Sequence, residues 1–155
     1  VTGDLEHPNI VPVYQNGVDS DGLPFYAMKL IRGVEWRFIL HPELADERCD
    51  RDLLERLRNA VDPIDVFLRT CDAVAFAHSR GVVHRDLKPE NIMVGEYGEV
   101  QVMDWGLALD VSGRPPDRTK AVAASRIRGP AGSPAYMAPE MALGMTDRIG
   151  VRTDV

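Results

Sequence analysis

The sequence predicts an α+β fold, and three observations support this. Short apolar runs separated by turn residues occupy 1–33 and 82–103, which is typical of strands. Residues 62–80 instead repeat apolar side chains with the period of a helix. The composition is that of a folded chain, because 45% of the 155 residues are hydrophobic and 27% are charged. By length alone, the chain suffices for one domain with its own core.

The first part of the chain predicts an antiparallel hairpin. Residues 10–14 form a short apolar run, and the turn signal Asn16-Gly17 follows it. Residues 19–22 form a second turn cluster, and 25–31 are a plausible strand. Two strands alone are marginally stable in water, so this hairpin needs further packing partners.

The segment 43–58 carries six acidic and four basic residues, with leucines between them. This pattern predicts a surface helix with a thin apolar stripe. The preferred interpretation of its charged face is a solvated surface without a partner.

The clearest predicted helix spans 62–80. Asp62 is a good N-cap, Pro63 suits the first helical position, and Gly81 supplies the stop. One face is predicted to be apolar, and the stripe that defines it consists of Phe67, Cys71, Val74 and His78, widened by Ile64, Leu68 and Ala75. We therefore expect a largely buried helix, with Cys71 as a small core residue.

Strands are also expected at 82–83, 92–94 and 100–103, with a polar loop over 84–91. Residues 110–130 hold five basic and two acidic residues together with prolines and glycines, which predicts a loop.

Composition also argues against several classes of function. A net charge of −6 argues against non-specific binding to nucleic acids or acidic membranes. No run approaches the length of apolar residues that a membrane span needs, and no leader peptide is visible at Val1. Cys49 and Cys71 lack metal-ligand spacing and fit a reducing compartment, so a cytoplasmic location is expected.

The residues that predict chemistry lie in the polar loop. Transfer of a phosphoryl group to a hydroxyl needs a carboxylate for the hydroxyl proton, a cation near the transferred group and oxygen ligands for Mg²⁺. Asp86, Lys88 and Asn91 supply these three groups within six residues, and Asp104 follows 18 residues after Asp86. Mg²⁺ prefers one or two carboxylates together with phosphate oxygens, which suits this pair of Asn and Asp.

The stretch 84–91, His-Arg-Asp-Leu-Lys-Pro-Glu-Asn, resembles the catalytic loop of eukaryotic-type protein kinases. Residues 104–106, Asp-Trp-Gly, resemble the Asp-Phe-Gly motif with Trp in the Phe position, and 132–140 resemble the segment that ends in Ala-Pro-Glu. The three motifs occur in the family's order. Lys88 follows the pattern of Ser/Thr kinases, and the sequence as a whole most resembles bacterial Ser/Thr kinases.

The resemblance implies a partial two-lobed kinase fold. Residues 1–33 would be the end of the N-lobe sheet and the hinge, and 34–155 the first half of the C-lobe. It also implies ATP and Mg²⁺ as cofactors and a protein Ser/Thr hydroxyl as the acceptor. Asp86 and Lys88 would be catalytic, and Asn91 and Asp104 would hold Mg²⁺. The residues implied to form the ATP site are Met28, Lys29, Leu30, Ile31, Lys88, Asn91, Met93 and Asp104.

Further roles follow from the same resemblance. His84 would be structural, Ser133 would hydrogen-bond Asp86 and Lys88, and Asp154 would brace the catalytic loop. Arg85 would pair with a phosphorylated residue of the following loop. The best candidates for that phosphorylation are Thr119 and Ser125. Glu140 would pair with an Arg late in the domain.

The family's glycine-rich loop and its ATP-binding Lys are absent from the 155 residues, so we expect a fragment with weak or no activity in isolation. Two alternatives remain open at this point. The chain could be an inactive kinase remnant that serves as a binding module, or it could resemble small-molecule phosphotransferases. The latter lack the Lys88-Pro89 pair and the Ala-Pro-Glu segment.

Overall fold

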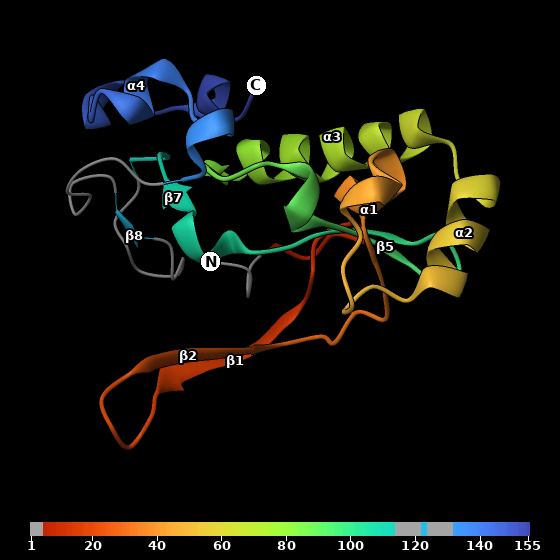
Figure 1. The fold of residues 1–155 in the computed structure, drawn as a ribbon. Coiled ribbons are helices and arrows are strands. Elements are labelled where there is room, and N and C mark those ends of the chain that lie inside the picture. Colours follow the sequence, from red (N-terminus) through yellow and green to blue (C-terminus); the bar gives the residue numbers. More distant parts are fainter. Residues whose placement is uncertain (1–4, 114–121, 124–131) are drawn as a thin grey trace.

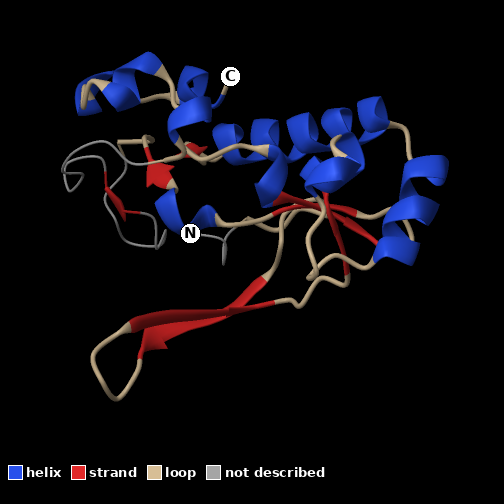
Figure 2. Cartoon of the chain, in the orientation of Figure 1, coloured by secondary structure: helices blue, strands red, loops and turns tan. Residues whose placement is uncertain are grey.

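A computed structural model describes residues 5–113, 122–123 and 132–155 (Figure 1). It confirms an α+β fold of short strands and helices (Figure 2). The longest helix, α3 (Pro63–Ser79), runs across a small central sheet, and a long hairpin projects away from that sheet (Figure 1). The strands of the two small sheets in the body of the fold are β3 (Gly33–Glu35), β4 (Val82–Val83), β5 (Ile92–Gly95), β6 (Val100–Val102), β7 (Leu109–Asp110) and β8 (Val122–Ala123).

The predicted hairpin forms from β1 (Val13–Val18) and β2 (Pro24–Met28), which pair antiparallel. Its turn is the predicted cluster at 19–22, where the Asp19 carboxylate accepts hydrogen bonds from the backbone N–H groups of Asp21 and Leu23. The turn predicted at Asn16-Gly17 is wrong, because both residues lie within β1 and pair with residues of β2. The apolar run at 10–14 is only partly strand. Its first residue, Ile10, instead forms a parallel bridge with Val102 of β6.

The central sheet has the strand order β3-β5-β6, and all of its pairs are antiparallel. The strands predicted at 92–94 and 100–103 are therefore confirmed as β5 and β6. Val94 and Val100 of this sheet are fully buried, and they pack with leucines of α2 (Arg51–Ala60) and with Phe38 of α1 (Trp36–Leu40) in one hydrophobic cluster. This cluster holds the sheet and the neighbouring helices together.

Helix α3 has the predicted ends but not the predicted buried face. Asp62 accepts a hydrogen bond from the Ile64 N–H, as an N-cap does. Phe67 is 54% exposed, and Cys71 is exposed rather than a core residue. Val74 of the predicted stripe is buried as expected, but the other buried residues each lie one position before a residue of that stripe: Val66, Thr70, Ala73 and Ala77. Apolar residues occur on both sides of α3, so the spacing alone did not identify the face that packs.

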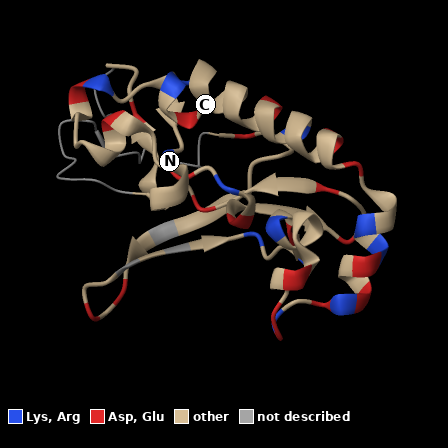
Figure 3. Cartoon of the chain, turned by 45° about the horizontal axis from the view of Figure 1, so that its top comes forward, with Lys and Arg blue, Asp and Glu red and all other residues tan. Residues whose placement is uncertain are grey.

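The charged segment 43–58 is only partly helical. Helix α2 begins at Arg51, because the Asp50 side chain caps the N–H of Leu53. Its apolar stripe of Leu53, Leu54 and Leu57 is buried as predicted. Figure 3 shows acidic and basic residues interspersed along α2. Helix α1 is too short to give a clear sequence period, and the sequence did not predict it. In the part of the chain that the structure describes, no helix is both long and apolar enough to cross a membrane.

Gly33 shows how closely the strands of the central sheet approach. A Cβ atom at this position would overlap the backbone carbonyl of Val94 on the paired strand. We expect Gly33→Ala to lower the free energy of unfolding by about 1–3 kcal/mol, the usual cost of overpacking. Urea denaturation followed by circular dichroism measures this change. Gly150→Ala is the matched control, because open space surrounds Gly150 and its backbone is extended. Equal stability losses in the two variants would contradict the prediction.

Candidate active site

The polar loop connects β4 to β5, and its last residues form the short 3-10 turn Pro89–Asn91. Asp86 is buried in this loop, at 8% exposure. Its carboxylate oxygens accept hydrogen bonds from three neighbours. The Lys88 Nζ donates to Oδ2 at 2.9 Å, and the Ser133 backbone N–H donates to Oδ1 at 2.7 Å. The Asn91 Nδ2 donates to Oδ2 at 3.1 Å.

Ser133 is distant from Asp86 in the sequence but belongs to the same hydrogen-bond network, as the resemblance implied. Its Oγ accepts a hydrogen bond from the Lys88 Nζ at 2.5 Å, while its N–H contacts Asp86. The ammonium group of Lys88 therefore sits between a carboxylate and a hydroxyl. This arrangement places one cation and one carboxylate at a single point on the loop.

Asp86 remains ionised in this environment. Burial by itself raises the pKa of the Asp86 carboxyl, but hydrogen bonds from Lys88 and Ser133 outweigh it and leave the pKa below its ordinary value. A carboxylate with a lowered pKa is a weak base but a permanent hydrogen-bond acceptor. It is suited to orienting a hydroxyl group and to receiving its proton late in a reaction.

Asn91 precedes β5 and Asp104 follows β6 at the same end of this strand pair. Ile92 pairs with Val102 across these strands, and the Met103 N–H donates to the Asn91 carbonyl at 2.8 Å. The Nδ2 group of Asn91 also donates to the Asp86 carbonyl at 2.7 Å, so this amide group turns its Oδ1 away from Asp86. Asp104 is exposed, and its backbone is left-handed, with φ of 55°. An amide oxygen and a carboxylate therefore lie at the same edge of the site.

The amide oxygen of Asn91 and the carboxylate of Asp104 are oxygen ligands, the kind that Mg²⁺ binds. Among the described residues, no group of three or more His, Cys, Asp or Glu side chains could hold a metal ion. Mg²⁺ does not need such a cage, because it usually keeps waters and takes one or two carboxylates with substrate phosphates. The amide oxygen of Asn91 and the carboxylate of Asp104 fit that mode of binding.

His84 has the structural role that the resemblance implied. It is 1% exposed, and its Nδ1 accepts the Asp86 N–H while its Nε2 lies 2.9 Å from the Met103 carbonyl. Because Nδ1 is an acceptor, the ring proton is on Nε2. Burial lowers the pKa of His84, so the ring is neutral. Its ring contacts that of the buried Trp105 at a centroid distance of 4.6 Å, and this Trp fills the position where the related motif has Phe.

Asp154 braces the loop, as the resemblance implied. Its carboxylate oxygens each accept a backbone N–H at 2.7 Å, from His84 and from Arg85. A third contact comes from the Nε2 of His78 on α3, at 2.8 Å. The sequence did not predict a role for His78, because it falls in the apolar period of its helix. The available signal was a polar ring at a position of the apolar stripe.

Arg85 adopts a left-handed backbone, with φ of 70°, which non-glycine residues rarely take up. Its Nε donates to the Leu107 carbonyl at 2.6 Å. Burial lowers the pKa of Arg85, and among the described residues no carboxylate forms an ion pair with it. The proposed phosphorylation sites, Thr119 and Ser125, lie outside the described residues.

The residues implied for the ATP site lie at the base of the hairpin and on β5. Met28 ends β2 and is 37% exposed, and Leu30 is 82% exposed. The Lys29 N–H donates to the Pro12 carbonyl at 2.9 Å. Ile31 is partly buried in the hydrophobic cluster that also includes Leu87 of the catalytic loop. The end of the implied hinge and the catalytic loop therefore pack against the same hydrophobic cluster.

Met93 lies on β5 opposite Glu35 and Gln101, and it is partly buried. Glu140 accepts a hydrogen bond from the Thr153 hydroxyl at 2.7 Å, and Thr153 directly precedes Asp154. The short helix α4 (Pro139–Ala142) is therefore linked to the segment that braces the loop. The Arg implied as the partner of Glu140 remains a prediction.

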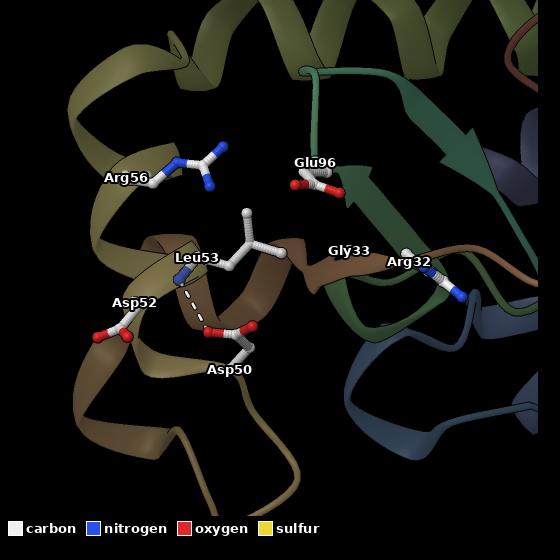
Figure 4. Close-up of a pocket in the computed structure, with 7 residues that line it drawn as sticks. All are labelled: Arg32, Gly33, Asp50, Asp52, Leu53, Arg56 and Glu96. Atoms are coloured by element: carbon white, nitrogen blue, oxygen red, sulfur yellow. Dashed lines mark hydrogen bonds between the residues drawn. The ribbon is translucent and has the colours of Figure 1, made fainter.

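A separate hollow of about 350 Å³ lies between the start of β3, helix α2 and the β5–β6 turn. Figure 4 shows Arg56 of α2 and Glu96 of that turn facing each other across it. None of the residues implied for ATP or catalysis lines this hollow, so it is distinct from the site around Asp86.

Comparisons with known proteins show the family of the chain. The whole chain, residues 1–155, matches the family described as protein kinase domain. It is 38% identical to a serine/threonine-protein kinase PknD of Protochlamydia amoebophila, over 100% of this chain and 16% of that protein. It is 35% identical to a serine/threonine-protein kinase PknD of Chlamydia muridarum, over 93% of this chain and 17% of that protein. The chain thus spans about a sixth of the length of these relatives, and it belongs to the protein kinase domain family.

Proposed function

We propose that the protein containing these 155 residues transfers the γ-phosphate of ATP to Ser or Thr hydroxyls of proteins, with Mg²⁺. The observation that carries this proposal is the network in which Lys88, Asn91 and Ser133 all hydrogen-bond the Asp86 carboxylate. The serine/threonine kinase names of the similar proteins support the same conclusion.

In this proposal Asp86 receives the hydrogen bond of the substrate hydroxyl, aims its oxygen at the γ-phosphorus and accepts its proton as the new O–P bond forms. The leaving group is ADP. Lys88 lies 2.9 Å from Asp86 and supplies positive charge next to the transferred group. The lowered pKa of Asp86 keeps it ionised at neutral pH, so it accepts a hydrogen bond without prior loss of a proton.

Asn91 and Asp104 would hold Mg²⁺ at the end of β5 and β6. When bound, this ion neutralises charge on the phosphates and orients them. The backbone of residues 28–31 and the side chain of Met93 would bind adenine, with residues 1–33 as the hinge and N-lobe part and 34–155 as the C-lobe part. Ser133 hydrogen-bonds both Asp86 and Lys88, so it fixes the distance between the Asp86 carboxylate and the Lys88 ammonium group.

The direct test uses the purified full-length protein, radiolabelled ATP and a generic protein substrate. We expect phosphate on Ser and Thr, and we expect chelation of divalent ions with EDTA to abolish transfer, because the phosphates then lose the Mg²⁺ that would neutralise their charge. Adding Mg²⁺ back in excess should restore the rate. Phosphoamino acid analysis identifies the acceptor.

A second variant, Asp104→Asn, keeps the size of the side chain but removes the carboxylate that would bind Mg²⁺. It should need a higher Mg²⁺ concentration for half-maximal rate. Transfer that persists in EDTA, or label on Tyr alone, would contradict the proposal.

A further inference from the structure

Trp105 differs from the Phe of the related motif in one group that the proposed chemistry does not use. Its indole ring carries an Nε1–H, and this group donates a hydrogen bond to the Val102 carbonyl at 3.2 Å. The residue is 6% exposed and packs in the hydrophobic cluster that contains Val102 and Ala108. A phenyl ring in the same place has no N–H to donate. The hydrogen bond is therefore a feature of this chain that apolar packing alone does not supply.

This hydrogen bond closes a ring of four residues that contains Asp104. It joins the last residue of β6 to the residue that directly follows Asp104. Inside the ring the backbone of Asp104 is left-handed, with φ of 55° and ψ of 60°. A residue with a Cβ atom is strained in this region, so it stays there only where its neighbours hold it.

Both neighbours of Asp104 are held by hydrogen bonds. On one side, the Met103 N–H donates to the Asn91 carbonyl at 2.8 Å, and the Met103 carbonyl lies 2.9 Å from the His84 Nε2. On the other side, the indole of Trp105 is fixed to β6 through its Nε1–H. The strained backbone of Asp104 therefore lies between two fixed residues, and the indole N–H fixes the second of them.

Loss of this hydrogen bond would leave no backbone group unpaired. The Val102 carbonyl also accepts the Val11 N–H at 3.1 Å, and it keeps that partner when the indole N–H is removed. The cost of an orphaned buried acceptor therefore does not arise. We expect a variant that lacks only the indole N–H to fold, with its effect confined to the segment around Asp104.

We propose that the indole N–H of Trp105 is a positioning group that holds Asp104 in its left-handed conformation, and so keeps the carboxylate at the edge of the active site before nucleotide or ion binds. The inference rests on the proposed function, in which Asp104 would hold Mg²⁺. Without this hydrogen bond Asp104 leaves the left-handed region more often, and its carboxylate then leaves the edge that it shares with Asn91. Trp105 acts through Asp104 and is not itself catalytic.

The test replaces Trp105 in the full-length protein by benzothienylalanine, in which a sulfur atom takes the place of the N–H and the ring keeps its shape. Hydrogen exchange, measured by mass spectrometry without nucleotide or Mg²⁺, reports how often each segment opens. The N–H groups of Met103 and Ala108 are hydrogen-bonded, so a peptide over 103–108 reports on this segment. We expect this peptide to exchange about 3- to 10-fold faster than in the parent, the net effect of one hydrogen bond. Peptides from α3 should exchange at the parent's rate.

Trp36 provides the matched control. Its Nε1 is buried and has no hydrogen-bond partner among the described residues, and its ring packs against the other hydrophobic cluster. The same replacement at Trp36 removes an N–H that makes no hydrogen bond, so the peptide 103–108 should exchange as in the parent. Trp105→Phe loses the N–H together with part of the ring, and it should speed the exchange of this peptide at least as much as benzothienylalanine does.

Two results would overturn the proposal. One is equal exchange of the peptide 103–108 in the parent and in the protein with benzothienylalanine at position 105. The other is faster exchange of equal size in this peptide and in α3, because Trp105 would then act only as a core residue.

Mg²⁺ and ADP separate this inference from the proposed function. If Asp104 holds the ion, adding both should slow the exchange of the peptide 103–108, because binding favours the held state. If benzothienylalanine speeds this exchange but Mg²⁺ with ADP leaves it unchanged in the parent, the proposed role of Asp104 in binding Mg²⁺ fails and positioning by Trp105 stands. If Mg²⁺ with ADP slows the exchange and phosphate is transferred, but benzothienylalanine changes nothing, the proposed function stands and the positioning role fails.

Discussion

Asp86→Asn in the full-length protein is expected to lower kcat by about 100- to 10,000-fold, the range that a positioned acid or base contributes. The amide keeps the shape of the side chain, but it loses the charge and one of the two acceptor oxygens. Those oxygens now accept hydrogen bonds from Lys88, Asn91 and Ser133. The Kd for ATP should change little, because the residues implied to bind ATP remain.

Quenched-flow or steady-state transfer assays measure kcat, and calorimetry measures the Kd for ATP. Asp147→Asn is the control, since Asp147 is an exposed carboxylate in the turn Thr146–Arg148, away from the catalytic loop in the sequence. A variant at Asp86 that transfers phosphate at the parent's rate would show that the role given to this carboxylate is wrong.

Asp154→Ala should destabilise the protein and disable the loop at the same time. The Asp154 side chain is 1% exposed, and its removal leaves the N–H groups of His84 and Arg85 without acceptors. Each buried donor left unpaired costs about 1–3 kcal/mol, which is a large share of the 5–15 kcal/mol typical of a folded domain. The left-handed backbone of Arg85 then loses one of the contacts that hold it, so the loop relaxes and kcat falls.

Urea denaturation gives the free energy of unfolding, and transfer assays give kcat. Because Asp154→Ala carries a risk of not folding, Asp154→Asn provides a milder test. Its remaining carbonyl oxygen still accepts one N–H, while its amide NH₂ opposes the other, so we expect an intermediate loss. Parent-like stability and kcat in both variants would exclude the bracing role.

The sequence predicted the contacts of Ser133 and Asp154 better than it predicted the packing. The network around Asp86 followed from a resemblance that tied short motifs to defined roles, and Ser133 and Asp154 lie where those roles require. The ends of α3 were also predictable, because an N-cap, a proline and a glycine each impose a local backbone geometry.

Other features depend on tertiary contacts that no local pattern contains. The face of α3 that packs was not predictable, because Ile64 and Phe67 make the exposed side of the helix apolar as well. The start of α2 was misplaced because charge density does not mark a helix end, whereas the hydrogen bond from Leu53 to Asp50 does. The ion pairs of Arg37 join three separate elements, so only the fold brings them together.

The bracing contacts of Asp154 also constrain when the site is completed during synthesis. Asp154 is 70 residues downstream of His84, whose backbone it holds. At the usual rate of about 5–20 residues per second, a ribosome adds those residues in about 4–14 s. During that interval the catalytic loop has been made but lacks its acceptor. The catalytic loop is therefore expected to stay without its brace until the downstream segment that carries Asp154 has been made.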